Sequence, residues 1–408
     1  MTSFSVVQNS KYLFSTQQNP KEIQAVHSIR FVSAILIYIS HKAADHFSPI
    51  ANRTELSIVS ATSESVFGRI CALYTDTFLM ISGMLLTYSF IGRLQRGQKI
   101  RIFHEIAARY LRIVPPLLAL ILITIYVIPL LGSGPLWGVA VTRVSSICKQ
   151  HWWRNLLFIQ NWFGFENMCL LHTHHVGTDF ELFLIAPFLI ILLFKQPKKG
   201  MTLIVGLAIA STIARFYTTF TKELAYFVPF GVKLKQLVDT GDLMYSIPPY
   251  RYTVYAIGIV LGYYLRKLKN FQLSRLHLAL GWSICIGSHL AVNISGAAMT
   301  GMDYKYNATH AALFAAFAPI LWCLNSAWII FASHLGFTSN VNFHLMKFLD
   351  VKSESVSLDI ITKTMQWKGF IVTSRFTYAF YLVQIPVLQL KIATTRITSQ
   401  YGYHSIVS

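Results

Sequence analysis

The stretch H-T-H-H-V-G-T-D-F-E places His172, His174 and His175 within four residues and follows them with Asp179 and Glu181. Imidazole and carboxylate groups are common ligands of zinc. His175 and Asp179 are also one helical turn apart, so they would share one face of a helix. The stretch therefore offers either a corner of a metal site or a polar rim on a cavity, and the surrounding chain must decide between them.

A second group of ionisable residues lies in the apolar run that begins at residue 29. Arg30 and His41 are eleven residues apart, which returns an α-helix to within about 20° of the same face after a rise of about 16 Å. Asp45 follows one turn after His41 and can accept a proton from its ring, as carboxylates do beside a general base. The alternative is that His41, Lys42 and Asp45 only mark the end of a membrane span.

The elements that must position these residues are membrane helices. Of the 408 residues, 54% are hydrophobic and 12% are charged, whereas a soluble protein carries about 25% charged residues. Crossing the hydrocarbon core takes roughly 20 apolar residues. The apolar runs predict an all-α fold, a polytopic transmembrane bundle with about nine spans near residues 29–47, 71–91, 113–131, 176–194, 201–218, 250–265, 276–293, 309–331 and 371–390.

The net charge of +19 is explained by a membrane topology better than by a nucleic-acid partner, because Lys and Arg collect in cytoplasmic loops. The basic stretches 93–101, 195–199 and 266–269 predict a cytosolic N-terminus and a C-terminus on the outside. We expect a multi-pass protein of the endoplasmic reticulum or plasma membrane. Its parts would be a cytosolic segment without a signal peptide (1–28), a membrane domain (29–391) with a luminal loop (132–175), and a polar tail (392–408).

Two features agree with this topology. Asn52 and Asn307 stand in Asn-x-Thr sequences and fall outside, where glycans are added. Cys148 and Cys169 fall in one outside loop, where an oxidising compartment permits a disulfide. The alternative for the cysteines is two unpaired thiols.

The chain also resembles a known family, the acyltransferase family 3 membrane proteins, in the branch of the nematode "nose resistant to fluoxetine" proteins. The resemblance begins with F-S-V-V-Q-N-S-K-Y-L-F-S and the spacing from Arg30 to His41. It continues in order through T-D-T-F-L-M-I-S-G-M-L-L, A-R-Y-L-R-I-V-P-P-L, a loop with two cysteines, P-P-Y-R-Y-T-V-Y-A-I-G-I-V-L-G-Y and S-R-F-T-Y-A-F-Y-L-V, between about residues 4 and 390.

The resemblance implies transfer of an acyl group from acyl-coenzyme A to a hydroxyl of a lipid, glycan or other acceptor, with no bound cofactor and no metal. His41 would be the general base and Arg30 would hold the donor or supply positive charge. Arg109 and Arg112 share a helix face and would bind donor phosphates; the alternative is that they only anchor a helix end in the cytosol. Asp76 and Asp179 fall on acidic motif positions of the family, and Asp179 is the one expected in the active cavity.

Some features depart from the family. It usually has aromatic residues where His174 and His175 stand, which favours a polar cavity rim over a metal site, and it often has His where this chain has Gln384. The chain also ends before the last helical pair of the family, so C-terminal helices are expected to be missing. A second class of function remains open: a non-catalytic membrane protein that transports or presents lipids or amphipathic molecules, because transporters also keep charges in membrane cavities.

Overall fold

The computed structural model describes residues 5–17, 22–44, 50–268, 273–335, 364–365, 367–398 and 400, and these residues fold into a bundle of helices. Within those ranges, seven segments are helices long and apolar enough to cross a membrane. The expected polytopic all-α bundle is therefore confirmed. The seven are α5 (Cys71–Gln95), α6 (Ile102–Leu122, extended by further turns to Leu130), α8 (His174–Lys195), α9 (Pro197–Thr221), α12 (Arg275–Ala297), α13 (Ala308–His334) and α16 (Gly369–Thr394).

The two other predicted spans are also helices, α2 (Gln24–Ala44) and α11 (Pro248–Lys267). They are less apolar than the seven because α2 carries Arg30, His41 and Lys42 and α11 begins around Arg251. Both lie inside the bundle, where α2 packs between α5 and α16 and α11 packs along α5, α9 and α13. Polar side chains are tolerated at membrane depth when they face protein and not lipid.

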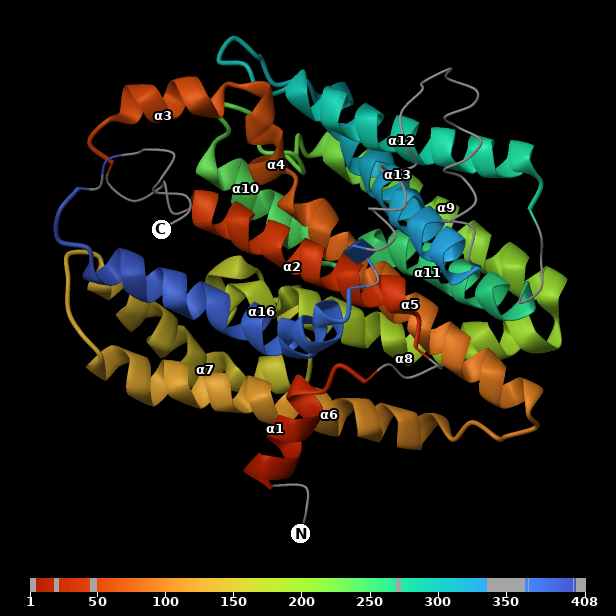
Figure 1. Cartoon of the computed structure of the whole chain (residues 1–408). Helices are drawn as coiled ribbons and strands as arrows, with labels where there is room; N and C mark the ends of the chain where they lie inside the picture. Colours follow the sequence, from red (N-terminus) through yellow and green to blue (C-terminus); the bar gives the residue numbers. More distant parts are fainter. Residues whose placement is uncertain are drawn as a thin grey trace.

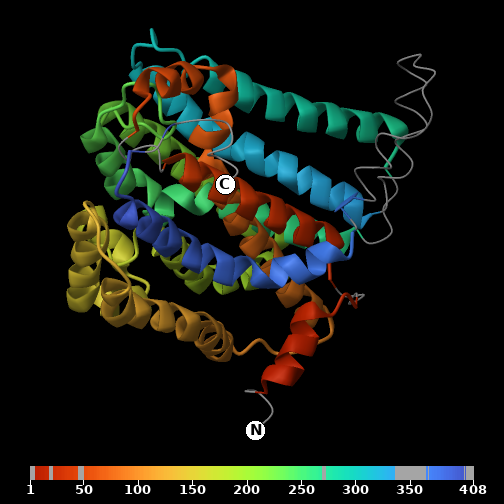
Figure 2. The same ribbon diagram turned by 60° about the vertical axis from the view of Figure 1, so that its left-hand side comes forward.

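The helices form a layered arrangement that both ribbon views show (Figures 1 and 2). α12 and α13 lie along one flank and α6 along the opposite flank, with α2, α5 and α11 between them. α8 and α9 are joined by Gln196 alone, so they must run antiparallel. α1 (Val6–Phe14) lies apart from the bundle core and is held to α16 by Arg375, which donates to the carbonyls of Leu13 at 3.1 Å and Ser15 at 2.7 Å.

The short helices gather at one end of the bundle, which we call the loop end (Figure 1). They are α3 (Arg53–Ser60), α4 (Val66–Arg69), α7 (Arg143–Leu156) and α10 (Leu234–Thr240). The loop after α12 lies there too, since the hydroxyl of Thr300 donates to the carbonyl of Ala61 at 3.5 Å. The loop end is the side that the charge distribution predicts to be luminal.

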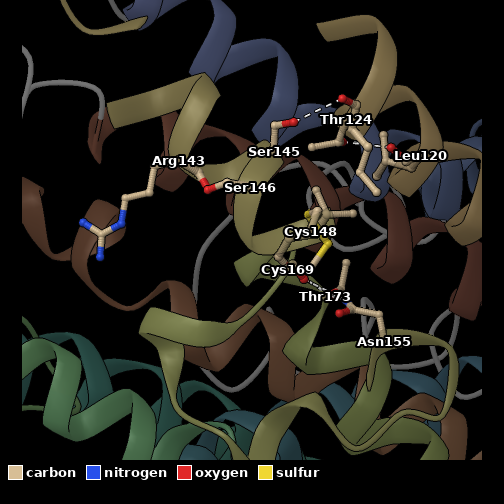
Figure 3. Close-up of a disulfide and its surroundings, with 11 residues drawn as sticks. Leu120, Thr124, Arg143, Ser145, Ser146, Cys148, Asn155, Cys169 and Thr173 are labelled. Carbon is tan, nitrogen blue, oxygen red and sulfur yellow. Dashed lines mark hydrogen bonds between the residues drawn. A yellow bond between two sulfur atoms is a disulfide. The ribbon is translucent and has the colours of Figure 1, made fainter. Parts of the chain in front are cut away.

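A disulfide joins Cys148 of α7 to Cys169 in the following loop, and both cysteines are fully buried (Figure 3). Next to it, the side-chain amide of Asn155 donates to the Cys169 carbonyl at 2.8 Å and to the Thr173 hydroxyl at 2.7 Å. These bonds fix the chain immediately before α8. The disulfide loop thus determines where the histidines at the start of α8 are placed.

Candidate functional site

Three arginines lie near one carboxylate where α2, α5, α6 and α8 approach one another. Arg109 of α6 forms an ion pair with Asp179 of α8 and donates to the hydroxyl of Ser82 in α5 at 2.9 Å. Its guanidinium also lies 4.3 Å from the centre of the Phe183 ring. α5, α6 and α8 therefore meet at this one side chain.

Arg30 of α2 and Arg112 of α6 lie within electrostatic range of both Arg109 and Asp179. We call Arg30, Arg109, Arg112 and Asp179 the arginine cluster. A single carboxylate cannot neutralise three guanidinium groups, so the cluster is electropositive. Among the residues that the structure describes, Arg109 Nε and Asp179 Oδ1 are buried without a hydrogen-bond partner. Spare guanidinium donors beside a net positive charge suit a phosphate or another anion.

A second cluster lies further along α2 and consists of His41, His172, His174 and Gln384. His41 interacts with Gln384 of α16 and lies within electrostatic range of His172 and His174. Gln384 is buried at 3% exposure. We call these four residues the histidine cluster.

The histidine tautomers can be assigned from their partners, because a carbonyl oxygen only accepts hydrogen bonds. His172 Nε2 donates to the Leu382 carbonyl at 3.0 Å and His174 Nδ1 donates to the Leu171 carbonyl at 2.9 Å. In the neutral rings, His172 Nδ1 and His174 Nε2 therefore carry lone pairs. These two nitrogens and His41 Nδ1 are buried and lack a partner within the described part of the chain. The cluster thus presents buried imidazole nitrogens that can accept a hydrogen bond.

Aromatic side chains enclose the histidines. The ring of Tyr245 lies 4.9 Å from that of His174, and the ring of Phe78 lies 6.4 Å from that of His175. Tyr381 of α16 lies 5.7 Å from His172, ring to ring, and its hydroxyl donates to the His172 carbonyl. Aromatic side chains from α5, from the turn Gly241–Tyr245 and from α16 therefore enclose these histidines. The cavity rim expected from the sequence stays a prediction. Across the described residues, no group of three or more His, Cys, Asp or Glu side chains is arranged to hold a metal ion.

Asp76, the other acid on a motif position, is enclosed by protein. Its side chain is 0% exposed, and its Oδ1 lies 2.8 Å from Arg251 Nη2. Tyr226 donates to Asp76 Oδ2 at 2.8 Å, and Arg251 also donates to the Thr75 hydroxyl at 2.9 Å. Burial, together with the negative charge of Asp76, raises the pKa of Tyr226 well above its usual value, so the phenol keeps the proton that it donates. Asp76 thus has protein partners where a substrate contact was expected.

Sequence reasoning did not select Gln384, Arg251 or Tyr226 as site residues. Gln384 was noticed only as a departure from the family pattern, although a polar residue in an apolar span is itself a signal. The same signal marks Arg251, which stands in the apolar run of α11. Tyr226 lies in a loop and carries no such signal. Asp45, expected to orient His41, lies outside the described residues.

The two candidate glycosylation sites both precede helices at the loop end. Asn52 stands before α3, and its amide donates to Glu55 Oε2 at 2.6 Å. Asn307 is exposed at the start of α13, where its side-chain oxygen accepts from the backbone N–H groups of Thr309 at 2.9 Å and His310 at 3.1 Å. Asn307 is therefore both an accessible acceptor sequence and a helix N-cap.

Comparison with known proteins identifies the family to which the chain is similar. The profile of a family described as "Acyltransferase domain" matches residues 23–400. "Nose resistant to fluoxetine protein 6" of Caenorhabditis elegans is 24% identical over 95% of this chain and 48% of its own length. "Regulator of hypoxia-inducible factor 1" of the same organism is 24% identical over 63% of this chain and 54% of its own length. The chain therefore spans about half the length of these relatives. No solved structure matches it.

Proposed function

The chain belongs to the acyltransferase domain family, and on that premise we propose that it is a membrane-embedded O-acyltransferase. It would move an acyl group from acyl-coenzyme A to a hydroxyl of a lipid, glycan or other acceptor. The observation that carries the proposal is that α2 holds an electropositive cluster around Arg30 and a basic, aromatic-lined cluster around His41, eleven residues further along. An anionic donor needs a positively charged site such as the arginine cluster, and a hydroxyl acceptor needs a proton acceptor such as His41.

The arginine cluster would bind the phosphates of the donor. It lies at the end of α2 that is predicted to be cytosolic, where acyl-coenzyme A is available. Arg109 is already oriented by Asp179 and Ser82, which reduces the side-chain entropy lost on binding. Asp179 would act by positioning Arg109 and by keeping the empty cluster from carrying three uncompensated charges.

The histidine cluster would activate the acceptor. His41 would take the proton of the acceptor hydroxyl while the oxygen attacks the thioester carbonyl. The new C–O bond forms as the electron pair of the carbonyl moves onto its oxygen and makes an oxyanion. The C–S bond then breaks, and the coenzyme A thiolate leaves and receives the proton from the His41 imidazolium. Gln384, buried beside His41, would hold the ring in the orientation that this transfer needs.

The test is acyl transfer by the purified chain in lipid nanodiscs, with acyl-coenzyme A labelled in its acyl group and a total lipid and glycan extract as acceptor. We predict that His41→Ala lowers kcat/KM by about 10²- to 10⁴-fold, the usual contribution of a general base. The matched control is His310→Ala, because His310 is exposed at the start of α13 and contributes only its backbone to the cap of that helix.

Thermal unfolding of each variant in detergent separates loss of chemistry from loss of fold. Equal transfer by wild type and His41→Ala would remove His41 from the mechanism. If the folded wild-type chain releases no coenzyme A and labels no acceptor while it still binds lipid, the non-catalytic alternative, a protein that transports or presents lipids, replaces the enzyme.

A further inference from the structure

A groove with a volume of about 980 Å³ lies between α9, α11, α12 and α13, on the flank opposite α6. It exists because α12 packs closely on α13, which leaves the space beside α9 and α11 open. None of the residues that line it belongs to the arginine cluster or to the histidine cluster. The acyl-transfer proposal therefore does not account for it.

The wall of the groove is hydrocarbon. Ile209, Ile257, Ile284, Phe317 and Leu324 are among its lining residues. Several polar side chains in the wall bond to protein: the hydroxyls of Thr212 and Thr253 lie 3.0 Å apart, and the Cys285 thiol lies 3.2 Å from the side-chain oxygen of Asn325. The indole N–H of Trp328 is the one buried donor in this lining without a partner among the described residues. A polar ligand would therefore lose its hydration here and gain few partners. An apolar ligand would gain by burial.

The groove opens sideways toward the position of the lipid. Ile209, Ile284 and Phe317 line it and are also 55%, 64% and 52% exposed. They stand on three helices that are long and apolar enough to span the membrane. The groove is therefore continuous with the lipid-facing surface, and a lipid chain can enter it without crossing water.

The length of the groove matches one leaflet. On α12 its lining runs from His277, near the start of the helix, to Ser288, and on α13 it runs from Phe317 to Phe331. Eleven to fourteen residues of helix rise about 16–21 Å, which covers half of the hydrocarbon core, about 15 Å. α12 starts at the end of the bundle opposite the loop end, which is predicted to be cytosolic. A chain in the groove would reach from the cytosolic surface to the middle of the bilayer.

The charges at the mouth favour an anionic head group. The sequences of α9, α11, α12 and α13 contain no Asp or Glu. Lys198 and Lys199 are exposed at the start of α9, and Lys267 is exposed in the last turn of α11. Basic residues at a membrane surface attract anionic lipids.

We propose that this groove is a binding site for one acyl chain of an anionic phospholipid from the cytosolic leaflet. The apolar wall selects hydrocarbon, the length selects a single chain of one leaflet, and the basic mouth selects a negatively charged head group. The site is separate from the proposed catalytic clusters, so the lipid is a resident of the membrane domain and not the acyl acceptor.

Photolabelling with a lipid probe tests this proposal. The full chain is reconstituted in phosphatidylcholine vesicles that contain phosphatidylserine with a photoreactive diazirine near the end of one acyl chain. We predict that irradiation labels the lining segments of α12 and α13 and that unlabelled phosphatidylserine competes for this labelling. Ile284→Trp fills the groove and should lower the labelling at least fivefold. Ile286→Trp is the matched control, because Ile286 is 53% exposed on the same helix and does not line the groove. It should leave the labelling unchanged within twofold.

Competition on the wild-type chain keeps the test decisive even if a variant fails to fold. Labelling that does not saturate would mean that the probe reports bulk lipid, and the proposal would fail. Equal labelling of the two tryptophan variants, or equally strong competition by phosphatidylcholine, would also overturn it. None of these measurements depends on acyl transfer. The lipid-site proposal can therefore be refuted while the acyltransferase proposal stands, and the acyltransferase proposal can be refuted while the lipid-site proposal stands.

Discussion

At the scale of single residues, Asp76 and Arg251 are among the most enclosed charged residues in the described part of the chain. Their side chains are 0% and 1% exposed, and their facing atoms are 2.8 Å apart. Removing two charges from water is costly, so such a pair persists only when further groups bond to it. Thr75 and Tyr226 supply these bonds. The pair therefore joins α5 to α11 and leaves neither charge for solvent.

Removing one member of this pair should be far worse than removing both. We predict that Arg251→Ala lowers the stability of the chain by about 3–5 kcal/mol, because it leaves a carboxylate buried without its counter-charge. The double variant Asp76→Leu with Arg251→Met should recover much of this loss, since apolar groups of similar volume replace the pair. Thermal unfolding of the purified variants in detergent measures the loss of stability in Arg251→Ala and its recovery in the double variant. A double variant no more stable than Arg251→Ala would show that the ion pair is not the source of the loss.

The sequence predicted pairs of residues that lie close together along the chain, and it missed contacts between residues that are far apart along the chain. The helical period alone places Arg30 and His41 on one face of α2. Cys148 and Cys169 share one loop, and the structure joins them. Arg251, by contrast, meets Thr75 across a separation of 176 residues, and Tyr226 meets Asp76 across 150. No local period reveals such contacts, because they depend on which helices become neighbours.

At the scale of elements, the closest helix contact in the middle of the bundle is made by glycines. A Cβ at Gly258 would meet the backbone oxygen of Met80, and one at Gly262 would meet that of Met84. In the opposite direction, a Cβ at Gly83 would lie 2.6 Å from the backbone oxygen of Tyr255. Small residues on both sides let two membrane helices approach closely. Gly83 is therefore a packing residue.

A single methyl group in this contact should separate the helices. We predict that Gly258→Ala destabilises the protein by about 1–3 kcal/mol, the usual effect of overpacking. Gly206→Ala is the matched control, because nothing lies within 4 Å of a Cβ at that position on α9. Alanine there should be neutral or stabilising by up to about 1 kcal/mol, since it lowers the entropy of the unfolded chain. Equal unfolding temperatures for the two variants in one detergent would contradict the close contact.

The elements themselves were largely predictable. Each of the nine predicted spans overlaps one long helix of the structure. The periodicity did not reveal that α2 and α11 lie inside the bundle while α9 and α12 expose much of their surface. Hydropathy measures how apolar a helix is, and it does not say which neighbours cover it. The polar residues of α2 and α11 were the feature of the sequence that could have indicated that these two helices lie inside the bundle.

At the scale of the whole molecule, the distribution of basic residues and the grouping of short helices at the loop end describe one topology. The basic stretch 195–199 lies at the turn between α8 and α9, at the end of the bundle opposite the disulfide loop. Asn52, Asn307 and the disulfide belong to the loop end. If the loop end is luminal, both asparagines should carry glycans.

We predict two glycans on the chain when it is made in mammalian cells. Thr54→Ala and Thr309→Ala should each remove one glycan and increase mobility on a denaturing gel, because the hydroxyl residue is part of the acceptor sequence. Thr309→Ala is preferable to changing Asn307, whose side chain caps α13 and whose loss would cost about 1 kcal/mol.

Ser295→Ala is the control for this experiment. It removes the third acceptor sequence, whose Asn293 lies inside α12 with its amide bonded to the His289 carbonyl at 2.8 Å. That variant should leave the mobility unchanged. A chain whose mobility glycosidase treatment does not alter would reverse the predicted orientation of the bundle, and with it the access of acyl-coenzyme A to the arginine cluster.

The ion pair between α5 and α11 also has a consequence for how the protein is made. A ribosome adds about 5–20 residues per second, so the 176 residues that separate Thr75 from Arg251 take about 9–35 s to synthesise. For most of that interval α5, which ends at Gln95, is complete, and Asp76 lacks the guanidinium of Arg251. The carboxylate of the nascent α5 must find other partners, such as water at the membrane edge, until α11 emerges. A chain that stalls before Arg251 would therefore keep Asp76 in α5 without this ion-pair partner.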